Sequence, residues 1–205
     1  MTLAALAAIY FVHLAAAMSP GPAVLLAART ALRDGMTRGV YLSIGIGLGA
    51  VIWAIAALFG LALLFQMAPK LLIGFKLIGA SYLLYLAYKI WKHAPEPMQT
   101  DLPEGKTGLS NLGLVRLGIT TQLANPKPAL FFGTVFLTFM PVDAPAWAYP
   151  VVLGIVFFND TGWNIIVARI FSLERTRRVY MTLKTVFDRV FGGLLAALSA
   201  KLVLS

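Results

Sequence analysis

Long runs of apolar residues, separated by short polar connections, dominate the sequence. A window of roughly 19 residues picks out six runs, at residues 3–28, 39–66, 69–91, 111–140, 146–170 and 182–204. Each run is long enough to cross a bilayer as a helix, which takes about 20 residues. The pattern therefore predicts an all-α integral membrane protein with six transmembrane helices.

One longer polar segment, residues 92–110, interrupts this pattern and is rich in Pro, Glu, Gly, Asp and Lys. It leaves three apolar runs on either side. We therefore expect a single membrane domain over 1–205, with one repeat at about 1–91, a cytoplasmic linker at 92–110 and a second repeat at about 111–205.

Composition supports a membrane protein and excludes an ordinary soluble domain. The chain is 60% hydrophobic and 12% charged, whereas a soluble domain carries about 25% charged residues. Cysteine is absent, which excludes disulfides and thiolate metal sites. The net charge of +9 does not indicate a nucleic-acid partner, because the basic residues cluster between apolar runs, as in the cytoplasmic loops of membrane proteins.

The basic residues are distributed unevenly between the two sides of the predicted spans. Thirteen of the 17 basic residues lie around the connections that follow the first, third and fifth runs: Arg29, Arg33, Arg38, Lys89, Lys92, Lys106, Arg116, Arg169, Arg175, Arg177, Arg178, Lys184 and Arg189. The positive-inside rule places these connections in the cytoplasm. We therefore expect a multi-pass protein of the bilayer with both termini periplasmic.

Two proline motifs interrupt the first and fourth runs, as Ser-Pro-Gly-Pro at 19–22 and Asn-Pro-Lys-Pro at 125–128. A proline inside a helix removes a hydrogen bond and clashes with the preceding turn, at a cost of ~3 kcal/mol. In lipid, the freed carbonyls are tolerated only where they face protein or a water-filled cavity. The motifs therefore predict two broken helices that line a cavity.

The two motifs occupy equivalent places in the two halves of the chain. They are 106 residues apart, and a second pair of similar segments, 76–80 and 189–193, lies towards the end of each half. Because each half has three spans, the second half must enter the membrane from the opposite side. This predicts a 3+3 inverted repeat, the architecture of many secondary transporters, although packing alone is an alternative explanation of the prolines.

A broken helix can bind both ends of an amino acid. The half-helix after the break directs free N–H groups at a carboxylate, and the half-helix before it leaves carbonyls for an ammonium group. Ser19 and Asn125 are good N-cap residues, so they could cap only, or also contact the substrate. The candidate substrate-binding residues are Ser19, Pro20, Gly21, Pro22, Asn125, Pro126, Lys127, Asn159, Trp163 and Asn164.

Two charged residues inside the spans are candidates for a functional role, because a charge in a bilayer is costly. Lys127 could hold a substrate carboxylate or form a static ion pair with Asp160. We take Asp160 as the only acidic residue deep in a span, on a polar helical face with Asn159, Trp163 and Asn164. It is a candidate for proton coupling or ammonium binding.

Several other residues are weaker candidates. Lys76 and Arg189 lie near span ends, where they could simply reach the interface, and His13 could be a packed histidine with a satisfied hydrogen bond. Gly39, Ser43 and Gly47 recur every four residues, a spacing that lets helices approach closely. The partner helix could belong to the same chain or to a homodimer.

These motifs together resemble the lysine exporter (LysE/RhtB) family. The resemblance rests on Ser19-Pro20-Gly21-Pro22, the Gly-rich second run, Lys-x-x-Gly-Ala-x-Tyr-Leu at 76–83, and Asn125-Pro126-Lys127. It implies an exporter of amino acids or their derivatives in the bacterial inner membrane, driven by the proton motive force and without a cofactor. Ala50 stands where some members have a polar or acidic residue, which favours a neutral substrate.

Two other function classes fit the sequence less well. A metal-ion exporter of a related family is the alternative, but hard cations need several carboxylate oxygens. An intramembrane enzyme would need a cluster of His, Asp and Glu, or a nucleophile with a base. We expect neither a metal site nor an enzyme, since His13 and Asp160 are far apart in sequence.

Overall fold

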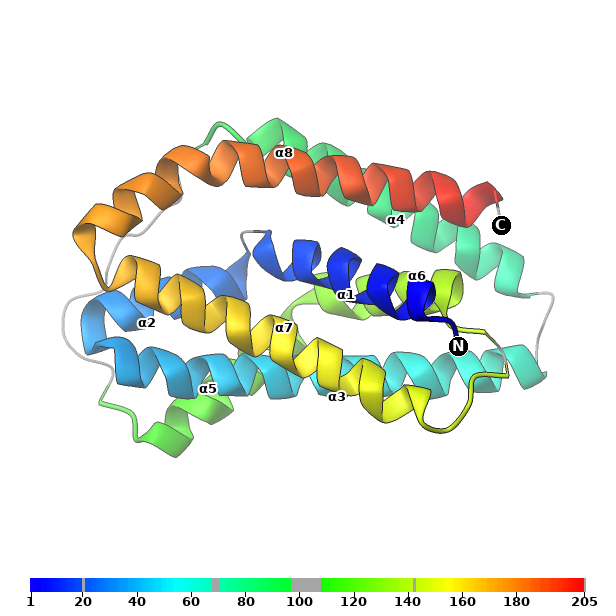
Figure 1. The fold of residues 1–205 in the computed structure, drawn as a ribbon, viewed down its shortest axis with the longest axis horizontal. Helices are drawn as coiled ribbons and strands as arrows, with labels where there is room; N and C mark the ends of the chain where they lie inside the picture. Colours follow the sequence, from blue (N-terminus) through cyan, green and yellow to red (C-terminus); the bar gives the residue numbers. More distant parts are fainter. Residues whose placement is uncertain (20, 68–70, 97–107, 142, 205) are drawn as a thin grey trace.

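The protein is all-helical over the residues that the structure describes. The structure is a computed structural model of residues 1–205, and it describes all of them except 20, 68–70, 97–107, 142 and 205 (Figure 1). The described residues contain eight helices and no strand. The helices are α1 (Leu3–Met18), α2 (Pro22–Asp34), α3 (Met36–Met67), α4 (Leu71–His93), α5 (Asn111–Ala124), α6 (Pro126–Phe139), α7 (Ala148–Phe171) and α8 (Glu174–Leu204).

Two of these helices are long and apolar enough to cross a membrane, by length and composition. They are α7 and the segment Met36–Gly60 of α3, with mean hydropathies of 1.6 and 2.3. A third span of this kind forms if α1 and α2, which meet at 59°, count as one bent helix. The integral membrane class is therefore confirmed, while the total of six spans stays a prediction.

Both helix breaks occur at the proline motifs. At the first break, Ser19 has extended backbone (φ −67°, ψ 126°), and its N–H donates to the Ala16 carbonyl at 3.2 Å. At the second, Asn125 is also extended (φ −84°, ψ 117°), and its N–H donates to the Gln122 carbonyl at 3.2 Å. The two breaks thus share one local geometry.

Proline then starts each following helix. Pro22 and Pro126 occupy the first turns of α2 and α6, where a missing N–H costs nothing because it would have no intrahelical partner. The motifs therefore act as helix ends and helix starts in immediate succession, rather than as kinks in a continuous helix.

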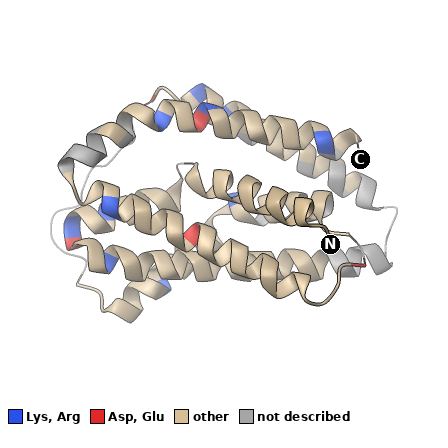
Figure 2. Cartoon of the chain, in the orientation of Figure 1, with Lys and Arg blue, Asp and Glu red and all other residues tan. Residues whose placement is uncertain are grey.

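Helix α3 is the central element of the packing. It packs most extensively on α5 and α7, and also on α2 and α6, while α4 packs chiefly along α8 on one side of the molecule (Figure 1). The two termini lie at the same end of the molecule (Figure 1). Basic residues gather at the opposite end, where α2 ends, α3 begins and α7 ends (Figure 2).

Glycines allow the close approach of α3 to its neighbours. A Cβ added to Gly45 would collide with the backbone carbonyl of Val115 on α5, and one added to Gly39 would lie 2.9 Å from the Ala168 Cβ on α7. A Cβ on Gly47 would likewise collide with the Thr161 hydroxyl. The small-residue stripe is therefore filled within the chain, by α5 and α7.

We predict that Gly45→Ala destabilises the protein by about 1–3 kcal/mol, the usual cost of forcing an extra carbon into a packed interior. The measurement is the thermal midpoint of unfolding in detergent. Gly60→Ala in the same helix is the matched control, because a Cβ there meets no described atom within 4 Å. Equal midpoints for the two variants would contradict the close packing of α3 on α5.

Candidate functional site

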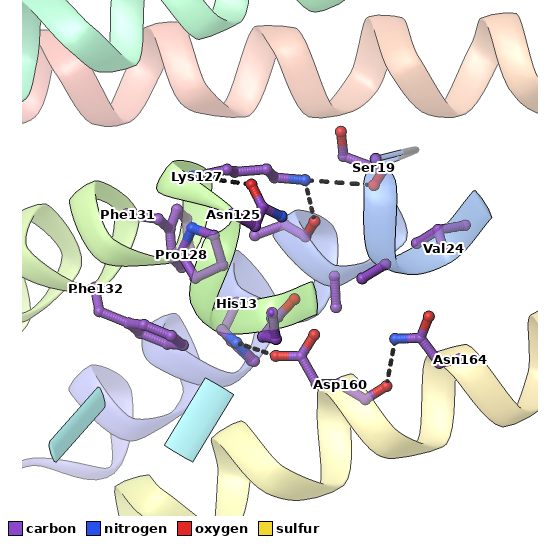
Figure 3. A pocket seen from close by; sticks show the side chains of 15 residues that line it. His13, Ser19, Val24, Asn125, Lys127, Pro128, Phe131, Phe132, Asp160 and Asn164 are labelled. Carbon is purple, nitrogen blue, oxygen red and sulfur yellow. Dashed lines mark hydrogen bonds and ion pairs between the residues drawn. The ribbon is translucent and has the colours of Figure 1, made fainter. Parts of the chain in front are cut away.

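A small cavity, lined by both polar and apolar residues, lies between the two helix breaks (Figure 3). Residues from α1, α2, α5, α6 and α7, together with the two breaks, line it. They are His13, Ala16, Ala17, Ser19, Gly21, Ala23, Val24, Gln122, Asn125, Lys127, Pro128, Phe131, Phe132, Asp160 and Asn164. The cavity has a volume of about 40 Å³, whereas a cavity of about 150 Å³ accommodates benzene. In this conformation it has room for water but not for a whole amino acid.

The second break satisfies its own helix N-terminus. The Lys127 N–H donates to the Asn125 side-chain oxygen at 3.1 Å, and Pro126 and Pro128 have no N–H to offer. Asn125 is therefore a cap, one of the two roles that its sequence position allowed. On the other side of this break, the indole N–H of Trp53 donates to the Gln122 carbonyl at 3.2 Å.

The first break is organised differently. Its N-cap residue is Gly21, and among the described residues no side chain caps α2. The Ser19 side chain, 2% exposed, does not cap either, because its hydroxyl has no hydrogen-bond partner in the described structure. The N–H groups of a first helical turn have no acceptor within the helix. In α6, the Asn125 side chain supplies an acceptor, whereas in α2 no described side chain does.

Lys127 connects the two breaks. Its ammonium donates to the carbonyls of Ala16 (3.0 Å) and Ser19 (3.3 Å), at the C-terminal end of α1 (Figure 3). It also lies 5.0 Å from the ring centroid of Phe191 on α8, a cation–π contact. A cation at a helix C-terminus is stabilised by the helix dipole. A charge from the second half of the chain thus neutralises a helix end in the first half.

Asp160 is paired with His13, which was only a weaker candidate in the sequence. The Asp160 Oδ2 atom lies 3.2 Å from His13 Nε2, and both residues are buried. The Asn164 side-chain N–H donates to the Asp160 backbone carbonyl at 2.8 Å (Figure 3). The structure therefore places His13, and not Lys127, within ion-pair distance of the Asp160 carboxylate.

Four buried polar atoms around the cavity have no hydrogen-bond partner among the described residues. They are His13 Nδ1, Ser19 Oγ, Gln122 Oε1 and Asn164 Oδ1. Buried polar groups in proteins are nearly always hydrogen-bonded, because leaving one unpaired costs free energy. All four belong to residues that line the cavity, but the atoms themselves are buried, so a polar ligand or water reaches them only when the cavity opens.

The remaining predicted residues lie outside this cavity or outside the described structure. The Asn159 amide donates to the Tyr10 carbonyl and joins α7 to α1, and Trp163 packs in a hydrophobic cluster beside Phe187. Arg189 is exposed on α8. Pro20 and the side chains of Lys76 and Pro126 lie outside the described residues.

Sequence reasoning missed some lining residues. Gln122 lies three residues before Asn125, just as Ala16 lies three residues before Ser19. This equivalent position in the second break was a signal that Gln122 is a polar residue beside the cavity. Phe131 and Phe132 flank His13, with ring centroids 5.9 and 5.2 Å from it. Aromatic residues in an apolar run carry no signal that separates the lining of a cavity from the lipid face.

Asp160 is not the only buried acidic residue among those that the structure describes. Asp188 on α8 is 4% exposed, and its Oδ2 atom lies 2.7 Å from the ammonium of Lys184, one turn earlier. Lys184 also donates to the carbonyl of Ala94 at 3.2 Å, and the Thr185 hydroxyl donates to the same carbonyl at 3.0 Å. The pair thus joins α8 to the residue after the end of α4, and the i, i+4 spacing of opposite charges was its signal.

No metal centre is evident in the described structure. Within the described ranges, no three side chains of His, Cys, Asp or Glu come together in a group that could hold a metal ion. The cavity instead offers isolated polar atoms of several kinds. That arrangement suits a small polar organic molecule better than a hard cation, which takes six to eight oxygen ligands.

Comparison with known proteins identifies a family of membrane translocators. Residues 14–205 match the family described as LysE type translocator. The chain is 30% identical over 195 residues to the threonine efflux protein of Escherichia coli K12, covering 95% of each protein, and 29% identical over 195 residues to that of Salmonella typhi, again covering 95% of each. It is 26% identical to the E. coli membrane protein YahN, over 90% of this chain and 82% of that one. No solved structure matches the chain.

We predict that Lys184→Met destabilises the protein by about 3–5 kcal/mol, because it leaves the buried Asp188 carboxylate without its cation. The double change Lys184→Met with Asp188→Leu should recover most of the loss, since it removes both charges. Thermal unfolding in detergent measures both effects. Lys89→Met, at an exposed basic residue of α4, is the control, and an equally large loss there would show that the ion pair is not the cause.

Proposed function

The chain belongs to the LysE type translocator family, and we propose that it is a secondary active exporter of amino acids across the bacterial inner membrane. The observation that carries this proposal is the cavity between the helix breaks. It combines a carboxylate, an ammonium group and four unpartnered polar atoms from separate elements. A zwitterion needs such a mixture of donors and acceptors in a small space.

The proposed substrate is a small neutral amino acid such as threonine. Support comes from the threonine efflux proteins, which match 95% of the chain, and from the single carboxylate, that of Asp160, among the residues that line the cavity. Metal export, the alternative, receives no support from the described residues, because they hold no cluster of metal-binding side chains.

Transport requires the cavity to enlarge, because about 40 Å³ is too small for the substrate. We propose alternating access between two three-span halves arranged as an inverted repeat. Part of the packing supports this, since α1 on α7 corresponds to α5 on α3, and α2 on α7 corresponds to α6 on α3. The packing of α2 on α3, by contrast, has no equivalent between α6 and α7 among the described residues. If each helix is exchanged with its equivalent in the other half, α3 changes places with α7 and α4 with α8, so these two contacting pairs are unchanged.

The proposed orientation puts the basic end of the molecule in the cytoplasm and both termini in the periplasm. It follows from the positive-inside rule, and the termini lie together at the end away from most of the basic residues (Figures 1 and 2). Export then runs from the basic end to the end that carries the termini.

Protons are the proposed coupling ion, with Asp160 as the group that exchanges them. Its carboxylate is buried, lines the cavity and lies 3.2 Å from His13. Imidazole and carboxylate side chains are common members of intramembrane proton relays. Proton exchange at this pair would change the charge of the cavity between the loaded and empty states.

The proposed function predicts that cells expressing the protein export threonine. Cells loaded with a threonine-containing dipeptide should release more free L-threonine into the medium than cells carrying an empty vector. The measurement is the external amino-acid profile over time. If no amino acid were released faster, while tolerance of a metal ion changed, the export proposal would be wrong.

The coupling proposal predicts that Asp160→Asn abolishes proton-driven threonine transport in proteoliposomes, because an amide cannot exchange a proton. Uptake driven by an imposed pH gradient should fall at least ~10-fold, the effect of about 1.4 kcal/mol on a rate. Asp143→Asn, at an exposed loop position, is the matched control. Undiminished proton-driven transport by Asp160→Asn would remove this residue from the coupling role.

A further inference from the structure

Three of the four helix ends at the two breaks already have internal partners. The carbonyl end of α1 accepts from the Lys127 ammonium, and the carbonyl end of α5 accepts from the Trp53 indole. The N-terminus of α6 is capped by Asn125 and contains two prolines. Only the N-terminus of α2, among these four ends, has no side-chain partner in the described structure.

The open helix end has space and a polar side chain next to it. A Cβ built on Gly21 would meet no described atom within 4 Å apart from its two chain neighbours, so a side chain at this position would meet no steric barrier from the other described residues. Ser19, two residues earlier, is 2% exposed and has an unpartnered hydroxyl that can donate a hydrogen bond. Both residues line the cavity.

The electrostatics of this end favour a negative charge. The N-terminus of a helix carries a partial positive charge, and the Lys127 ammonium lies 3.3 Å from the Ser19 carbonyl. Lys127 is held by backbone carbonyls and not by a carboxylate, so its charge is not cancelled by an acidic side chain in contact with it.

The opposite wall of the cavity has the complementary character. Asp160 presents a carboxylate, and Asn164 presents a side-chain oxygen without a partner among the described residues. Figure 3 shows Asp160 and Asn164 on one side of the cavity and Lys127 and Ser19 on the other. Oxygen acceptors beside a carboxylate suit an ammonium group.

We infer that the two breaks are unequal, and that the first one alone binds the carboxylate of the substrate. The carboxylate accepts hydrogen bonds from the N-terminus of α2 and from Ser19, with Lys127 as a fixed countercharge. The substrate ammonium lies against Asp160 and Asn164. This inference rests on the proposed function, because it assigns the two poles of the same cavity.

The absence of cysteine from the chain allows a test whose readout is a reaction rate at each pole and not the amino acid released. Ser19→Cys and Asn164→Cys place a single thiol at either pole. Both positions are buried beside a cavity too small for an amino acid, so a sulfonate-bearing or a trimethylammonium-bearing methanethiosulfonate reagent is applied to cells during export, when the cavity opens. The ratio of anionic to cationic reaction rates should be at least ~10-fold higher at residue 19 than at residue 164, equivalent to about 1.4 kcal/mol.

A second change tests the role of Lys127. Adding Lys127→Met to Ser19→Cys should abolish most of the preference for the anionic reagent, whereas Lys127→Arg should keep it. Equal rate ratios at the two poles, or an anionic preference that survives Lys127→Met, would overturn the inference. These outcomes are read from reaction rates and not from threonine release, so failure here and failure of the export proposal can be told apart.

Direct binding gives a measurement on the unaltered protein. Calorimetric titration with L-threonine should yield an affinity at least ~10-fold higher than titration with L-threoninamide, whose neutral amide replaces the carboxylate. In Lys127→Met the difference between the two ligands should shrink. Tighter or equal binding of the amide by the unaltered protein would contradict a carboxylate site.

Discussion

The contact between Lys127 and the C-terminal end of α1 is the interaction on which the rest of the site depends. Breaking a helix inside a membrane exposes carbonyls that lipid cannot satisfy, and at the first break the Ala16 carbonyl accepts only the Ser19 N–H from the backbone, while the helix ends before the Ser19 carbonyl. The Lys127 ammonium satisfies them from the other half of the chain. In return, the carbonyls solvate a charge that would otherwise be costly to bury.

The tight packing around α3 holds the helices that carry the two breaks close together. Glycines on α3 bring α5 and α7 close to it, and these helices carry Gln122 and Asp160 into the cavity. Helices α4 and α8 pack chiefly on each other and are joined by Lys184 and Ala94. The cavity therefore lies among helices that α3 packs against, and the pair α4–α8 is held mainly by its own contacts.

The helix breaks could be predicted from sequence because proline acts through covalent structure: it lacks an N–H wherever it occurs. The importance of Lys127 and Asp160 could also be predicted, since charges in apolar runs are rare. Their partners could not, because a lysine near a broken helix can reach a carboxylate or a carbonyl, and only the packing decides between them. Asp188 was missed for a related reason, since a charge near a span end resembles an interfacial one until burial is known.

A symmetric scaffold has to lose some symmetry to bind a zwitterion, whose two ends differ. The two motifs here differ most at one place, where Gly21 in the first corresponds to Lys127 in the second, 106 residues later. Glycine leaves the space beside α2 free of side chain, and lysine fills the carbonyl end of α1. Pro22, where α2 starts, corresponds to Pro128, but α6 starts two residues before that position, at Pro126. Asn125 therefore caps α6, and Pro128 lies within its first turn. The glycine-to-lysine difference and the two-residue shift thus distinguish the two motifs, while the carboxylate of the cavity comes from Asp160 on α7, outside both motifs.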